Sequence, residues 1–292
     1  MLDIIFQKVQ KHKEKAIIIF GALCILDIFL YIQIANTGIN KNLAIHFLNV
    51  GQGDSQLVIL PGNVKILIDG GPINGRVLSE LADTFPGTDR YIDLVVMSHA
   101  QTDHFGGLID ILKTYKVGAF LWSGRKGSAK SFNDLEQVIA QNEVKSITVE
   151  KGDKITYEKN LIQILSPKKE FMESKELNDT TVVLELESNN TKALFTGDIS
   201  SEIEEQLVSA GLTHVDILKV SHHGSKYSSS LVFLRALNPK LSVIEVGKNS
   251  YGHPTAQSLA NIISVGSSLY RTDKDGTVHV LIDGKTIKVY TE

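Results

Sequence analysis

SHAQTDHFGG, residues 98–107, is the stretch of sequence that decides the fold. It follows the apolar run YIDLVVM (91–97), whose continuous hydrophobic residues are typical of a strand buried on both faces. His99, Asp103 and His104 stand at the end of this predicted strand, where a sheet can aim side chains at one point. Imidazole and carboxylate groups together suit Zn²⁺, Mn²⁺ or Fe²⁺. The stretch therefore predicts a divalent metal site.

Two later strand ends carry the same kinds of side chain. Asp198 ends the predicted strand ALFTGD (193–198), and a histidine pair, His222 and His223, ends DILKVSHHG (216–224). Any one histidine taken alone is more often structural than a ligand. Three clusters at the ends of buried strands are hard to produce by chance, so we expect them to form one metal centre.

The rest of the sequence alternates short β-rich runs with helical segments in two similar halves. This pattern predicts an α/β fold in which two sheets are sandwiched between helices. No linker is long or Gly/Ser-rich enough to divide residues 42–292, so we expect a single domain there. A hairpin is expected around 188–191, and a terminal hairpin is expected to turn through DKDG (273–276).

An apolar segment precedes this domain. Residues 16–35, AIIIFGALCILDIFLYIQIA, have Asp27 as their only charge and at 1.5 Å per residue cover roughly the ~30 Å of a bilayer core. The segment is predicted to be an uncleaved transmembrane anchor in a lipid membrane. Four lysines lie within 1–15 and only Lys41 follows closely, so the N-terminus is expected in the cytoplasm and the domain outside the cell.

Charge and cysteine content exclude several kinds of site in the outer portion. Removing the four Lys and three acidic residues of 1–35 from the totals of 30 and 33 leaves 26 basic residues against 30 acidic ones. This balance is not the basic footprint of a nucleic-acid-binding domain, so an anionic substrate must be held locally. The only cysteine is Cys24, within the apolar segment, which leaves no disulfide or thiolate metal site outside it.

Seven motifs in order give the sequence a family resemblance. They are FLNVGQGDS (47–55), LIDGG (67–71), NDTTVVLEL (178–186), LFTGD (194–198), LKVSHHGS (218–225), NSYGHP (249–254) and RTDKDGTV (271–278). Together with SHAQTDHFGG, which resembles the motif HxHxDH, they resemble the metallo-β-lactamase superfamily. More narrowly, the chain resembles the extracellular hydrolase domain of ComEC-type competence (DNA-uptake) proteins. The resemblance implies a four-layer αββα sandwich over 42–292.

The resemblance also implies roles for particular residues. His99 would bind a first ion, Asp103 and His104 a second, and Asp198 would bridge the two. His223, with His222 as the alternative, would complete the second site. The centre would hold one or two ions, Zn or Mn. Asp103 would also orient the reacting water, and His253 would contact a substrate oxygen or protonate the leaving group.

Two departures from the family motif concern the first ion. Gln101 stands where the motif has a second histidine, and Asn178 stands where many members place another. A neutral amide oxygen is a poor ligand for Zn²⁺, so Gln101 is expected to be a weak one. The first site is accordingly expected to be weak, to select a harder ion, or to have lost activity.

The leading functional hypothesis is a phosphodiesterase or nuclease that attacks DNA, or another phosphodiester polymer, with a metal-activated water. A phosphocholine or teichoic-acid esterase at the cell surface would use the same chemistry. A binding module whose site has decayed at Gln101 is the alternative of another class. Ser225, Lys226 and Ser228 are candidates to hold a phosphate, whereas Asp54 is expected to brace the metal shell and Asp69 to be structural. The sequence identifies no protein partner.

Overall fold

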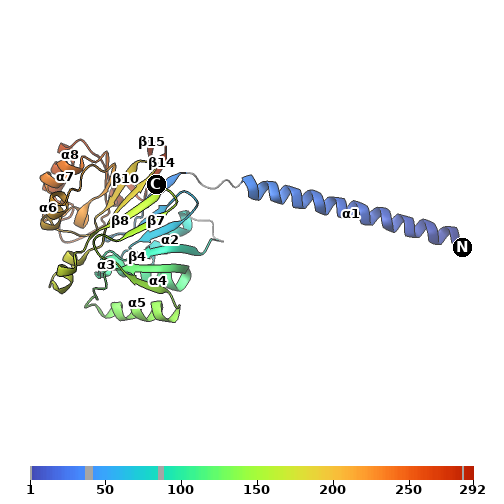
Figure 1. Cartoon of the computed structure of the whole chain (residues 1–292), viewed down its shortest axis with the longest axis horizontal. Coiled ribbons are helices and arrows are strands. Elements are labelled where there is room, and N and C mark those ends of the chain that lie inside the picture. Colours follow the sequence, from blue (N-terminus) through green and yellow to red (C-terminus); the bar gives the residue numbers. More distant parts are fainter. Residues whose placement is uncertain (1, 37–41, 85–88, 285) are drawn as a thin grey trace. The chain divides into compact units, whose positions relative to one another are not determined.

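The computed structural model describes residues 2–36, 42–84, 89–284 and 286–292 (Figure 1). The chain divides into two compact units, of which the first contains helix α1 (Leu2–Asn36) and the second is Asn42–Glu292. Within α1, side chains are described at 12, 13 and 15–31. Over the described residues, no helix has the length and apolar character needed to cross a membrane. The anchor at 16–35 stays a prediction.

Two sheets form the centre of the second unit. The eight-stranded sheet has the order β15-β14-β1-β2-β3-β4-β5-β6. Its strands, in chain order, are β1 (Leu43–Phe47), β2 (Gln56–Ile59), β3 (Lys65–Ile68), β4 (Tyr91–Val96), β5 (Lys116–Trp122), β6 (Lys145–Thr148), β14 (Val278–Asp283) and β15 (Thr286–Thr291). Strands β3 to β6 run parallel to one another, and the remaining pairs are antiparallel.

The seven-stranded sheet has the order β13-β12-β11-β10-β9-β8-β7. Its strands are β7 (Lys154–Tyr157), β8 (Asn160–Ser166), β9 (Val183–Ser188), β10 (Thr191–Phe195), β11 (Ile217–Lys219), β12 (Leu241–Ile244) and β13 (Ser268–Arg271). Strands β10 to β13 are parallel. The predicted hairpin between β9 and β10 is confirmed: Ser188 pairs with Thr191, and Asn189 and Asn190 both have positive φ, as a tight hairpin turn requires.

Helices cover the outer faces of the sheets. They are α2 (Arg76–Thr84), α3 (Thr102–Phe105), α4 (Leu108–Thr114), α5 (Lys130–Gln141), α6 (Ser201–Ser209), α7 (Leu231–Leu237), α8 (Ala256–Ser264) and α9 (Thr272–Asp275), with short 3₁₀ turns η1 (Lys169–Glu173), η2 (Leu177–Thr180) and η3 (Ser221–Gly224). One apolar cluster fills the space between the sheets; a second packs α2, α4 and α5 on the eight-stranded sheet, and a third packs α6, α7 and α8 on the other. The predicted sandwich of two sheets between helices is confirmed (Figure 1).

The predicted terminal hairpin is wrong. DKDG does not turn one strand back on its neighbour, because β13 belongs to the seven-stranded sheet and β14 to the eight-stranded one. Thr272 is tied to the end of β12, where its hydroxyl accepts from the backbone N of Val246 at 2.9 Å and donates to Val246 O at 3.0 Å. Thr277 is tied to the other sheet, since its Oγ1 accepts from Asn49 N at 2.9 Å. The segment crosses between sheets, and the terminal hairpin is β14 with β15.

The helix predicted from about Gly106 to Tyr115 is α4, and a break at Gly106 and Gly107 separates it from the preceding α3. A Cβ on Gly107 would lie 2.0 Å from the backbone oxygen of Gly70, so only glycine permits this approach to the loop after β3. The N–H of Gly107 donates to Gly71 O at 2.9 Å, outside any helix. The break brings α3 against the ends of β3 and β4, where the side chains predicted to bind metal lie.

Candidate metal centre

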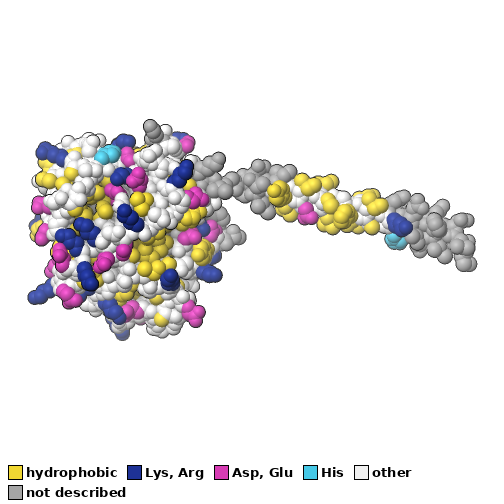
Figure 2. All heavy atoms as spheres, in the orientation of Figure 1, with side chains coloured by type: hydrophobic (Ala, Val, Ile, Leu, Met, Phe, Trp, Pro, Cys, Tyr) yellow, Lys and Arg dark blue, Asp and Glu magenta, His cyan; other side chains and the backbone are white. Residues whose placement is uncertain are grey.

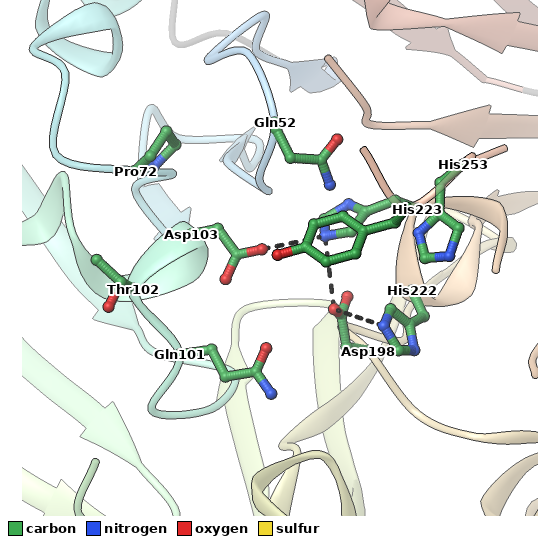
Figure 3. A pocket seen from close by; sticks show the side chains of 10 residues that line it. Gln52, Pro72, Gln101, Thr102, Asp103, Asp198, His222, His223 and His253 are labelled. Carbon is green, nitrogen blue, oxygen red and sulfur yellow. Dashed lines mark ion pairs between the residues drawn. The ribbon is translucent and has the colours of Figure 1, made fainter. Parts of the chain in front are cut away.

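The side chains that the sequence predicted as metal ligands lie together where parallel strands of the two sheets end. Figure 3 shows four of the side chains at this place, Asp103, Asp198, His222 and His223. In the eight-stranded sheet, β4 leads to the first histidine and α3 follows it. In the other sheet, β10 leads to an aspartate and β11 leads to η3. Carboxyl ends of parallel strands meet at one sheet edge, which explains the convergence. The residues brought together are His99, Asp103, His104, Asp198, His222 and His223.

The backbone of η3 is strained. His222 and His223 have φ of 50° and 51°, in the left-handed region that residues with a Cβ rarely adopt. Gly224 follows with φ 78°, and a Cβ there would lie 2.6 Å from Pro254 Cβ. Such strain persists only where the surrounding structure holds it, and it clusters at functional sites. It turns the two imidazoles to different surroundings: His223 is buried, whereas the side chain of His222 is 27% exposed.

Four groups of ligand atoms among the described residues could hold a divalent cation, and two of them consist only of residues that the sequence predicted as ligands. Atoms of His99, His104 and Asp198 lie within 4.8 Å of one another, as do atoms of Asp103, His104 and His223. Among the described residues, the buried Nε2 atoms of all three histidines and Oδ1 of Asp198 have no hydrogen-bond partner. Buried polar atoms without partners are costly, and a cation coordinated by neutral imidazole and carboxylate would satisfy them. The donor set therefore fits the metal that the sequence predicted.

The opposite edges of the imidazoles are held by protein groups. His104 Nδ1 lies 2.8 Å from Asp69 Oδ2, and Asp69 also accepts from Ser98 N at 2.7 Å. His223 Nδ1 donates to Glu245 O at 2.8 Å and lies 3.2 Å from Asp54 Oδ1. Partners at Nδ1 fix the ring orientation and leave Nε2 for a metal. Asp69, expected to be only structural, thus orients a predicted ligand.

His223 matches the geometry of a ligand better than His222 does. Its Nε2 lies 3.6 Å from Asp103 Oδ2 and 3.5 Å from Asp198 Oδ2. His222 Nε2 approaches Asp198 Oδ2 at 3.8 Å and belongs to none of the ligand groups found among the described residues. The geometry favours the first of the two alternatives that the sequence left open.

Lys219 is a functional-site residue that the sequence analysis missed. It is fully buried on β11 and forms an ion pair with Asp54, and its Nζ lies 3.7 Å from Asp198 Oδ1. It also donates to Gly197 O at 2.9 Å. Although burial opposes it, the charges of Asp54 and Asp198 raise the pKa of Lys219 above its usual value. The available signal was a lysine inside the otherwise apolar run ILKV (217–220), which indicates a buried partner.

Burial and nearby carboxylates set the pKa values of the histidines in the metal centre. Burial lowers the pKa of His99 to about 4, so this imidazole is neutral at neutral pH. Against the effect of burial, Asp198 and Asp54 raise the pKa of His223 to about 10, and the same carboxylates raise that of His104. When no metal is bound, His104 and His223 are protonated, and their positive charge balances the negative charge of the aspartates. A metal must displace those protons, so metal affinity rises with pH.

Gln101 and Asn178 bond to each other. Gln101 Nε2 donates to Asn178 Oδ1 at 2.6 Å, so the two amides that stand in place of family histidines are paired. Each amide satisfies part of the other's hydrogen-bonding capacity, which further weakens Gln101 as a ligand. With His104 Nε2 given to the second ion, the first ion would be left with His99 and Asp198 as strong donors.

Gln101→His distinguishes a weak site from a decayed one. The new imidazole would add a strong Zn²⁺ ligand and break the amide pair, so affinity for the weaker of two ions should rise by at least ~10-fold. Titration of the chelator-stripped protein with Zn²⁺ against a competing chelator measures it. Unchanged affinity would mean that position 101 does not face the first ion.

His99→Ala tests whether the first ion takes part in turnover. If it does, the rate should fall far more than in His279→Ala, which alters a histidine on β14 outside the metal-type groups. Wild-type turnover in His99→Ala would overturn the two-ion centre and leave a one-ion site on Asp103, His104, Asp198 and His223.

A cavity of about 430 Å³ opens onto the centre. Its lining residues are Gln52, Pro72, Gln101, Thr102, Asp103, Asp198, His222, His223, Tyr251 and His253 (Figure 3). His253, predicted to contact substrate, thus lies in the cavity wall, with its ring centroid 5.5 Å from that of His222. Two of the residues predicted to bind a phosphate, Ser225 and Ser228, do not line the cavity. They are buried within their loop, where Ser228 Oγ donates to Ser221 O at 2.9 Å.

Comparison with known proteins identifies related sequences. The family model described as Metallo-beta-lactamase superfamily matches residues 48–247. ComE operon protein 3 of Bacillus subtilis is 26% identical over 94% of this chain and 37% of its own length. Competence protein ComA of Neisseria gonorrhoeae is 28% identical over 79% of this chain and 31% of its own. The chain therefore spans about a third of the length of these curated relatives.

Solved structures share the fold. Tm1679, described as a metal-dependent hydrolase of the beta-lactamase superfamily, superposes with a TM-score of 0.55 and 15% identity over 80% of this chain and 98% of that one. YhfI of Bacillus subtilis, a metallo-beta-lactamase fold protein, superposes with a TM-score of 0.54 and 12% identity over 81% of this chain and 99% of that one. At these identities the likeness concerns the fold alone.

Proposed function

The chain belongs to the metallo-beta-lactamase superfamily, and from this premise we propose that it is a metal-dependent phosphodiesterase acting on DNA. The observation that carries the proposal is that the Nε2 atoms of His99, His104 and His223 are buried without a hydrogen-bond partner among the described residues. These histidines fall with Asp103 and Asp198 into groups whose ligand atoms lie within 4.8 Å of one another. The superfamily and its structural neighbours support metal-dependent hydrolysis.

The cavity residues have separate tasks in such a reaction. A divalent ion, when bound, would supply water of lowered pKa and neutralise charge on phosphate oxygens. Asp103 is partly exposed to the cavity, and the nearby histidines hold the pKa of its carboxyl below the usual range despite burial. As a carboxylate it can accept a hydrogen bond from the attacking water and orient it. Burial lowers the pKa of His253, so a neutral ring can contact a substrate oxygen.

The choice of DNA among phosphodiesters is supported by the resemblance to competence proteins, one of which aligns with 94% of this chain at 26% identity. The acidic balance outside residues 1–35 does not support broad electrostatic binding of a polyanion. On the face seen in Figure 2, acidic and basic side chains of the described residues are interspersed. Recognition is therefore assigned to the cavity and its immediate rim.

Metal loading and substrate choice test the proposal together. The full chain, purified in detergent, stripped with a chelator and reloaded with Zn²⁺ or Mn²⁺, should retain between about one and two ions per chain. It should then cleave single- or double-stranded DNA as well as a chromogenic phosphodiester, and the stripped protein should cleave neither. Elemental analysis and gel assays measure these outcomes.

Two results would contradict the proposal. A protein that takes up no metal at any concentration would refute both the site and the enzyme. Cleavage of phosphocholine or teichoic-acid esters with DNA left intact would move the function to the cell-surface esterase.

We propose in addition that 16–35 anchors the chain in the cell membrane with 42–292 outside. Support comes from the sequence of that segment and from the described side chains of α1, such as Ile17, Phe20 and Ile25, which are more than half exposed and apolar. The protein should remain with membranes after an alkaline wash, and protease added to intact cells should remove the domain. A soluble form beginning near Asn36 would contradict the anchor, and protection from external protease would reverse the orientation.

A further inference from the structure

A series of aromatic rings leads from the metal centre to the solvent. The centroids of His223 and His222 are 6.2 Å apart, those of His222 and His253 are 5.5 Å apart, and those of His253 and Tyr251 are 5.8 Å apart. The last two rings are inclined by only 32°. Tyr251 ends the series: it lines the cavity and yet is 73% exposed. Its ring therefore presents a wide apolar face at the cavity mouth.

The loop that carries Tyr251 is held in one shape by a single side chain. Asn249 Oδ1 accepts from Tyr251 N and His253 N, both at 3.1 Å, and its Nδ2 donates to Gly247 O at 2.9 Å and His253 O at 2.8 Å. An aromatic side chain on a backbone fixed in this way loses little conformational entropy when a ligand packs against it. A lone exposed tyrosine needs no function, but this one combines a braced loop with a place in the wall of the metal cavity.

The lining of the cavity offers no lysine or arginine for an anionic substrate. None of its ten described lining residues is Lys or Arg. Duplex DNA owes most of its non-specific affinity to many contacts between phosphates and such cations. Here the bound metal would have to hold the scissile phosphate, and further affinity must come from groups that do not depend on charge. Stacking of a base on an aromatic ring is such a contribution, and it is sequence-tolerant.

We propose that Tyr251 is a stacking platform for the nucleobase next to the scissile phosphate, and that the substrate is unpaired nucleic acid. The proposal rests on the proposed phosphodiesterase function. In a duplex both faces of each base are covered by neighbouring pairs, so a base can stack on Tyr251 only at an end or in a single strand. When the phosphate is bound at the metal, the rings of His222 and His253 lie between it and the ring of Tyr251.

Small ligands separate stacking from phosphate binding. The metal-loaded full chain is titrated with dAMP and with 2-deoxyribose 5-phosphate, which carries the same phosphate and no base. Wild type should bind dAMP about 10-fold to 100-fold more tightly, and Tyr251→Ala should bring the two ligands within about twofold of each other. Tyr251→Phe keeps the ring and should keep the preference. Tyr290→Ala, which removes a 52% exposed tyrosine from β15, is the control and should behave as wild type.

Other outcomes would overturn the platform. Equal binding of the two ligands by wild type, or an unchanged preference in Tyr251→Ala, would refute it. Tighter, Tyr251-dependent binding of phosphocholine than of dAMP would mean that the ring serves a quaternary ammonium by cation–π attraction. Equal cleavage of single- and double-stranded oligonucleotides would refute the preference for unpaired substrate. Failure to cleave any phosphodiester would refute the proposed function, and the dAMP preference is measured independently of cleavage.

Discussion

Asp198→Ala should abolish hydrolysis, lowering turnover by at least ~10³-fold, since even one lost donor to a transition state costs on the order of 10²–10³. Asp198 is buried at the meeting point of the two sheets, and its Oδ2 lies 3.4 Å from His104 Nε2 and 3.5 Å from His223 Nε2. Removing the carboxylate takes a shared ligand from both predicted ions and leaves Lys219 and any cation in mutual repulsion. Elemental analysis should show fewer than one tightly held ion per chain.

The matched control is Asp216→Ala. Asp216 likewise lies next to a strand of the seven-stranded sheet, with Lys240 Nζ at 2.8 Å and His214 Nε2 at 3.5 Å. It belongs to none of the groups of possible metal ligands among the described residues. Its loss should weaken folding while metal content stays as in wild type. Undiminished turnover in Asp198→Ala would rule out a bridging role and with it the ligand assignment.

Lys219→Met should cause the largest loss of stability of any single change considered, about 3–5 kcal/mol in the free energy of unfolding. The substitution preserves the length of the buried side chain and removes its charge, so Asp54 remains buried beside Glu245 and Asp198 without its lysine partner. Urea unfolding of the full chain in detergent, followed by the fluorescence of Trp122, the only tryptophan, measures the effect.

Two further variants locate the cause. Lys240→Met breaks a pair whose lysine is 64% exposed, so the loss should stay within about 1 kcal/mol. Asp54→Asn combined with Lys219→Met removes both buried charges and should recover part of the stability that Lys219→Met loses. If the single Lys219 variant is as stable as wild type, the ion pair with Asp54 does not hold this part of the structure together.

The sequence by itself determined the elements whose signals are local. The run 91–97 predicted the strand β4, and the turn expected around 188–191 predicted the β9–β10 hairpin. Histidine and aspartate at strand ends located the metal-type residues, because parallel strands must deliver their carboxyl ends to a common edge. Strands β6, β7 and β8 were not predicted. Strands β6 and β7 are short edge strands with many exposed residues, which give a weak hydrophobic signal.

Only the tertiary structure decided what depends on partners distant in sequence. In the local sequence, Lys219 is a polar residue that interrupts an apolar strand. Its burial depends on Asp54, which lies 165 positions earlier in the sequence and near the other sheet. The same holds for DKDG, whose local turn signal was overruled because Thr272 and Thr277 are tied to different sheets. The role of Tyr251 likewise depends on its place beside His253 at the cavity mouth. Burial, charge pairing and cavity walls are created by the packing of segments, and a linear pattern does not encode which segments will meet.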